Sequence, residues 1–190
     1  MEYKVETAAE AFDYSDVENI VCGKCRKTEV GTLGLNGIVH LGDPCYVGHD
    51  AELECVDLNV LPGNYKCSYW TGTLDYDHDG KHYHDNDGRA IGIYLDGNIP
   101  DVDAFEFYGR SVGVDSGTLG FFNTDDTIVL NTRFRDEKYL EDTDSVREGQ
   151  LTDDAFYWHT DDFDYPVFIA KNENGEIYAI EIREYSKYKR

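Results

Sequence analysis

The residues best suited to chemistry lie in the stretch DYDHDGKHYHDNDG, residues 75–88, which holds five aspartates, three histidines and two glycines. Asp75, Asp77 and Asp79 alternate and precede a glycine, as in the first half of an EF-hand loop, where carboxylates wrap a calcium ion. The twelfth position holds Asn86 instead of glutamate, and the flanks are β-rich, not helical. We therefore expect no EF-hand, but a free-standing calcium loop with these three aspartates as ligands stays open.

The same stretch has two other interpretations. His78, His82 and His84 offer imidazoles to zinc or nickel, although their spacing does not direct all three to one centre. The polar tip of a hairpin between two buried strands would have a similar composition, since Asp, Asn, Gly and His are common in turns. We expect an exposed loop between paired strands first and a metal site second, with calcium as the ion.

The cysteines suggest a second metal site. Cys22 and Cys25 form a C-x-x-C, and Cys45 with His49 forms a C-x-x-x-H, which together approach a zinc-ribbon spacing. The apolar context DPCYV around Cys45 favours a buried, inert thiol instead. The chain has five cysteines in all, an odd number that favours reduced thiols.

The charge is the dominant property of the whole chain, because 39 acidic and 17 basic side chains give a net charge of −22. Such a field repels nucleic-acid backbones, so we expect no direct DNA or RNA binding, but it attracts basic protein surfaces. The alternative is that the charge serves solubility alone. We find no signal peptide at the start and no apolar run near the ~20 residues of a membrane span, and so expect a cytoplasmic protein, in the host cell if phage-encoded.

The acidic residues are concentrated between Asp136 and Asp164, where eleven acidic side chains accompany two basic ones. Aromatic residues lie among these charges, as in protein interfaces. This combination suits contact with a basic protein partner. The residues that we assign to this surface are Asp153, Asp154, Tyr157, Trp158, Asp161 and Asp162.

Short β-favouring runs, broken by Gly, Asn and Asp, dominate the chain. The expected strands cover residues 28–35, 37–42, 64–74, 90–97, 104–115 and 118–123. Residues 165–185 predict a hairpin around Asn172–Gly175, central in its sheet because both runs are apolar on both faces. A helix is expected over residues 6–20, and residues 125–149 form either a second helix or a loop-rich insertion. We expect one mainly-β domain, residues 1–190, built as an antiparallel β-sandwich or open barrel with one or two short helices.

Four short motifs occur in a fixed order. They are LGDPCY at residues 41–46, PGNY at residues 62–65, VGVDSG at residues 112–117 and YPVFIAK at residues 165–171. In this order they resemble a domain-of-unknown-function family of bacteria and tailed phages, which carries DP, P-G-x-Y, GVDSG and G-D-G-x-Y-P-V motifs. The resemblance spans about residues 37–183 and implies a layout more than an activity.

The chain departs from the last of these motifs. Asp162 is retained, but Asp161 and Phe163 replace the two glycines of G-D-G-x-Y-P-V. Glycines there would allow positive φ or the close approach of a ligand. Their loss puts a shared small-molecule site in doubt.

Three aspartates, Asp43, Asp115 and Asp162, stand at strand ends within these motifs. If the fold brings them together, they could hold a divalent ion or divide acid and base roles, as in a metal-dependent hydrolase. Ser116 and Cys45 are weaker nucleophile candidates. The alternative is that these aspartates satisfy turn backbone, as Asp-Pro and Asp-Ser-Gly commonly do.

We favour a non-enzymatic acidic interaction protein, a phage or mobile-element accessory that binds a basic protein surface. Inhibition of a host factor, or mimicry of nucleic acid in its groove, would suit such a chain. The hydrolase and a virion structural component are the alternatives. The sequence leaves the oligomeric state open.

Overall fold

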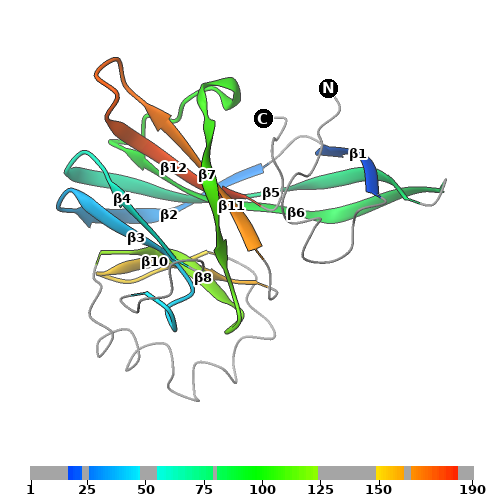
Figure 1. Cartoon of the computed structure of the whole chain (residues 1–190), viewed down its shortest axis with the longest axis horizontal. Helices are drawn as coiled ribbons and strands as arrows, with labels where there is room; N and C mark the ends of the chain where they lie inside the picture. The colour runs from blue at the N-terminus through cyan, green and yellow to red at the C-terminus, as the bar shows by residue number, and fades with distance from the viewer. Residues whose placement is uncertain are drawn as a thin grey trace.

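The computed structural model describes residues 17–22, 26–47, 55–78, 81–123, 149–160 and 164–183, with the backbone alone for residues 17–22, 73–78, 81–89, 102 and 150. These residues form two antiparallel β-sheets (Figure 1). The only helical element among them is the 3-10 turn η2 (Val102–Ala104). No helix in the described part of the chain is long and apolar enough to cross a membrane.

The larger sheet has seven strands. In spatial order, six of them are β1 (Val17–Cys22), β5 (Gly63–His78), β6 (Lys81–Leu95), β12 (Ile177–Arg183), β11 (Asp164–Lys171) and β7 (Glu106–Gly113). The seventh, β2 (Arg26–Leu35), also pairs with β5, along its first half, whereas β1 pairs with the last residues of β5. The far end of the β5–β6 hairpin therefore extends beyond the sandwich with β1 beside it (Figure 1).

The smaller sheet has five strands. In spatial order they are β4 (Cys55–Asn59), β3 (Ile38–Gly42), β8 (Thr118–Phe122), β10 (Ala155–His159) and β9 (Gln150–Leu151). Alternate side chains of the two sheets meet in one core, in which Tyr65 and Ile180 of the larger sheet join Phe121 and Trp158 of the smaller. The two sheets stay separate, so the predicted mainly-β fold is confirmed as a sandwich rather than a barrel.

The predicted C-terminal hairpin is confirmed. β11 and β12 pair directly, and both are interior strands because β12 also pairs with β6 and β11 with β7. The turn closes through Asn172, whose side-chain oxygen accepts hydrogen bonds from the backbone N–H groups of Asn174 (2.9 Å) and Glu176 (3.0 Å). Gly175 has φ of 80°, a conformation that glycine adopts without steric cost.

The connection at Leu35–Gly37 is a corner between the two sheets, not a hairpin. β2 pairs with β5 in the larger sheet, whereas β3 pairs with β4 and β8 in the smaller. Gly37 has φ of 104° and its carbonyl accepts a hydrogen bond of 3.0 Å from the backbone N–H of Val60. A local turn signal could not distinguish these two connections, because it does not determine which strands become partners.

The secondary structure expected from the sequence was incomplete in one respect and wrong in another. Strands β4, β9 and β10 were not expected, and the helix expected over residues 6–20 is wrong at its end, where Val17–Cys22 forms strand β1. Pairing with β5 stabilises this strand, and pairing is a tertiary contact that local helix propensity does not report. Residues 6–16, and nearly all of the second expected helix, lie outside the described residues.

Candidate functional site

Two of the sequence motifs converge on one corner of the sandwich. Asp43 directly follows β3, and Asp115 lies in the connection between β7 and β8. Because β3 pairs with β8, with Gly42 opposite Gly120, the two connections meet at the same end of the smaller sheet. Asp43 and Asp115 are neighbours through the backbone N–H of Asp115, and Asp162, the third member of the expected cluster, lies outside the described residues.

Asp43 is completely buried, and both of its carboxylate oxygens are occupied. Oδ1 accepts hydrogen bonds from the backbone N–H of Cys45 (2.7 Å) and from Ser116 Oγ (2.8 Å). Oδ2 accepts hydrogen bonds from the backbone N–H groups of Asp115 (2.9 Å) and Ser116 (2.7 Å). Four donors fill the acceptor sites of an ionised carboxylate, so Asp43 has no free lone pair for an ion or a water. The Asp43 side chain therefore links the turn after β3 to the connection between β7 and β8.

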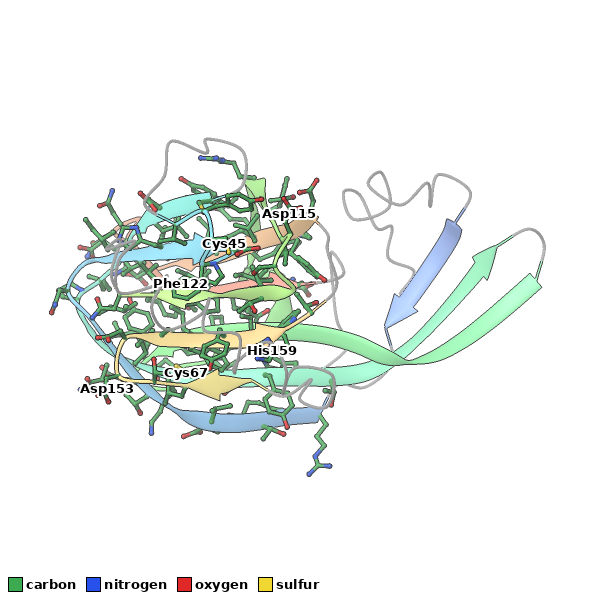
Figure 2. The ribbon with its side chains drawn as sticks, turned by 90° about the horizontal axis from the view of Figure 1, so that it is seen from below. Cys45, Cys67, Asp115, Phe122, Asp153 and His159 are labelled. Atoms are coloured by element: carbon green, nitrogen blue, oxygen red, sulfur yellow. The ribbon has the colours of Figure 1, made fainter. Side chains whose placement is uncertain are left out.

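Asp115 lies at the surface of this corner, where the Tyr46 hydroxyl donates to its Oδ2. Figure 2 labels Asp115 and the half-buried Cys45 on the two segments that meet here. The Ser116 hydroxyl donates a hydrogen bond to Asp43, whose carboxylate also accepts from three backbone N–H groups, so both side chains are held within the turns. Among the described residues, no three His, Cys, Asp or Glu side chains are grouped to hold a metal ion. The geometry fits the turn-backbone interpretation of these aspartates.

His159 is the nearby histidine that the sequence motifs did not point to. It lies opposite Thr118 in the β8–β10 pair, with its Nδ1 3.2 Å from Thr118 Oγ1 and its ring edge-on to Tyr157. The side chain is 8% exposed, and burial lowers the pKa of His159 below its ordinary value. The Nδ1 atom of His159 contacts Thr118, whereas the Ser116 hydroxyl donates its hydrogen bond to Asp43. Ser116 and His159 therefore do not form a nucleophile–base pair.

The Cys67 thiol is not suited to act as a nucleophile. It lies on the core face of β5, and burial raises the pKa of the Cys67 thiol to about 12. The thiol is therefore protonated at neutral pH, and the thiolate that reacts as a nucleophile is absent.

The predicted hairpin between paired strands is confirmed, but the described part of the acidic, histidine-rich stretch is strand rather than loop. β5 runs to His78 and β6 begins at Lys81, with Asp75 paired to His84 and Asp77 paired to His82. The expectation of a long exposed loop was wrong because backbone pairing does not require apolar side chains, and β1 pairs with the other side of β5 here. In extended backbone, alternate residues are about 6.8 Å apart, so Asp75 and Asp77 lack the wrapped conformation of a calcium loop. Asp79 lies outside the described residues.

The cysteine pattern is divided between two parts of the fold. Cys22 is paired with Leu74 on the extended hairpin, whereas Cys45 lies in the turn after β3 of the smaller sheet. Cys25 and His49, the other two zinc candidates, lie outside the described residues.

The expected partner-binding surface loses its aromatic members. Tyr157 is 0% exposed and Trp158 is 2% exposed, so assigning them to a contact surface was wrong. The density of acidic residues gave no indication that β10 is an interior strand of the smaller sheet. In this strand Trp158 faces the core, and Tyr157 packs with Val47 and Phe122 on the other face. Asp153 is exposed and Asp154 half-buried, while Asp161 and Asp162 lie outside the described residues.

A buried polar network on the outer face of the larger sheet was also missed. Trp70 Nε1 donates to the Tyr94 hydroxyl (2.6 Å), which donates to Glu181 Oε1 (2.7 Å). Arg183 pairs with the other oxygen of Glu181 through Nε (2.7 Å) and Nη2 (2.6 Å), and both charged side chains are at most 1% exposed. The signal was in the sequence, since IEIR places two charges at alternate positions of an otherwise apolar strand.

The chain matches no protein-family model, no curated protein and no solved structure in the three comparisons made. The fold and the contacts described above are therefore the basis for any statement about function.

Proposed function

We propose that this chain is a non-enzymatic acidic interaction protein that binds a basic surface of another protein. The observation that carries the proposal is the net charge of −22 on 190 residues. A field of this sign and size steers a basic partner into contact and repels nucleic acid. The motif resemblance, to a family of bacteria and tailed phages, suits a phage or mobile-element accessory. The charge suits an inhibitor of a host factor or a nucleic-acid mimic, acting in the cytoplasm.

The contacts at the motif corner favour binding over hydrolysis. A hydrolase using the aspartates would need a carboxylate open to an ion or a water. Asp43 is buried and has four hydrogen-bond donors on its two oxygens, so it serves the turns. No described feature favours a virion structural role over the binding role.

The test is recovery of a partner from host lysate on the immobilised protein, at low and moderate salt. We expect a basic protein whose recovery falls as salt rises, because salt screens exposed charges. The recovered protein is then purified and its dissociation constant measured against this chain alone. Recovery that does not depend on salt, or a partner without a basic surface, would contradict the proposal.

A further inference from the structure

Exposed aromatic side chains are found in β7. Three large apolar side chains of the described residues are exposed: Ile38 (49%), Phe107 (44%) and Tyr108 (38%). Ile38 is isolated in β3, whereas Phe107 and Tyr108 are consecutive. Tyrosine and phenylalanine are enriched at protein interfaces, and a pair of them in water has an unused contact area.

Acidic side chains precede this pair in the sequence. Residues 101–108 read DVDAFEFY, with three carboxylates and no basic residue. Asp101, Asp103 and Glu106 are all exposed. Glu106 bonds Lys171 at 2.6 Å, whereas Asp101 and Asp103 have no ion pair with any described residue. The segment therefore offers two exposed aromatic rings and two uncommitted carboxylates.

The strand is poorly suited to pair with a second copy of the chain. β7 is the last strand of its sheet, and residues 108–110 bulge opposite the single residue Val167. Gly109 in the bulge has φ of 87°. Bulges and charges at a sheet edge discourage strand addition, and two chains of charge −22 repel each other. The occupant is therefore a different molecule, held through side chains.

The chain's own Arg183 shows which side chain fits. Its guanidinium carbon lies 4.2 Å from the ring centre of Phe168 and 4.8 Å from that of Phe105. The Phe107 ring is 5.8 Å from the Phe168 ring, on the exposed side of the same aromatic cluster. A planar guanidinium stacks on aromatic faces and pairs with carboxylates at the same time. Phe107 thus extends to the surface a cluster that already holds one arginine.

We propose that residues 101–108, the β7 surface, bind an arginine of a flexible basic segment in the partner protein. The guanidinium stacks on Phe107 or Tyr108 and pairs with Asp101 or Asp103. This inference rests on the proposed function and deepens it, because it names the docking surface and the side chain recognised. Arginine is preferred over lysine, whose compact ammonium stacks less well and is more strongly hydrated.

The experiment measures fluorescence anisotropy of a labelled peptide of alternating arginine and glycine, with a lysine–glycine peptide of equal charge as reference. The test variants are Phe107→Leu with Tyr108→Leu, which keeps apolar volume but removes the rings, and Asp101→Asn with Asp103→Asn. Ile38→Ala is the control for exposed apolar area. Asp153→Asn with Asp154→Asn tests the surface expected from the sequence, and Asp96→Asn with Glu173→Gln, both exposed, is the control for charge.

We expect wild type to bind the arginine peptide more tightly than the lysine peptide. The leucine variant should weaken arginine binding about tenfold and lose the preference, while Ile38→Ala and the Asp96/Glu173 variant retain it. Melting temperatures equal to wild type show that each variant is folded.

Equal arginine affinity in wild type and the leucine variant would overturn the inference. A larger loss in the Asp153/Asp154 variant would place the surface elsewhere and likewise overturn it, leaving the proposed function intact. The proposed function fails separately, if recovery of a partner from lysate shows no dependence on salt.

Discussion

Ser116 Oγ donates a hydrogen bond of 2.8 Å to Oδ1 of Asp43, a residue 73 positions earlier in the chain. This contact joins the two sequence motifs GDPCY and GVDSG across the β3–β8 pair. It also commits both side chains to structure, since Asp43 accepts from four donors and Ser116 donates its one proton. The most suggestive catalytic residues of the sequence are therefore expected to affect stability.

Asp43→Asn should destabilise the domain by about 2–4 kcal/mol. An amide NH₂ would replace one carboxylate oxygen, and this NH₂ donor would face donor groups that now donate to that oxygen. Urea unfolding followed by fluorescence measures the change. Asp153→Asn, at an exposed position, is the matched control and should stay within about 0.5 kcal/mol of wild type. An Asp43→Asn variant as stable as wild type would show that the turns hold together without the carboxylate.

Ser116→Ala should lower the stability of the domain, whereas Ser68→Ala should not. Ser116 loses its bond to Asp43, at a cost of about 1 kcal/mol. The Ser68 hydroxyl is buried without a hydrogen-bond partner among the described residues, so its removal should be neutral or stabilising by up to about 1 kcal/mol. Thermal unfolding of the two variants in one buffer gives the comparison, and equal losses would contradict this account of both hydroxyls.

Stability should fall with acidification through His159. Burial holds its folded-state pKa below the value of about 6.5 that it takes when unfolded, so the unfolded chain binds a proton first. The contribution of His159 is therefore complete above that pH and is lost as pH falls toward the folded pKa. Unfolding free energies across this range should show a shallower slope for His159→Gln than for wild type. Thr118→Val, which keeps the imidazole, should retain the wild-type slope.

Removing Arg183 should be costly because it leaves the Glu181 carboxylate buried without its cation. Arg183→Met is expected to lose about 3–5 kcal/mol. Adding Glu181→Gln should recover part of that loss, since the amide oxygen still accepts from Tyr94 and no charge stays buried. A double-mutant cycle measures the coupling, and simple additivity of the two single losses would argue against a coupled pair.

The local pattern of the sequence was sufficient for the fold class and for part of the strands. The runs that became β2, β3, β5, β6, β7 and β8 are visible as β-favouring segments, and Asn172–Gly175 specifies its turn through one side chain and one positive φ. These signals are readable because period-two alternation and turn chemistry depend on residues near each other in the chain.

The tertiary structure decided which side chains are available. Phe156, Tyr157 and Trp158 lie among acidic residues in the sequence, yet β10 is interior and both of its faces are covered. Phe107 and Tyr108 look no different in composition, yet β7 is an edge strand and exposes them. Asp43 reads equally well as a catalyst or a clamp until Ser116 is placed against it. Burial and long-range pairing depend on which strands become neighbours, and that choice is made by the packing of the whole sandwich.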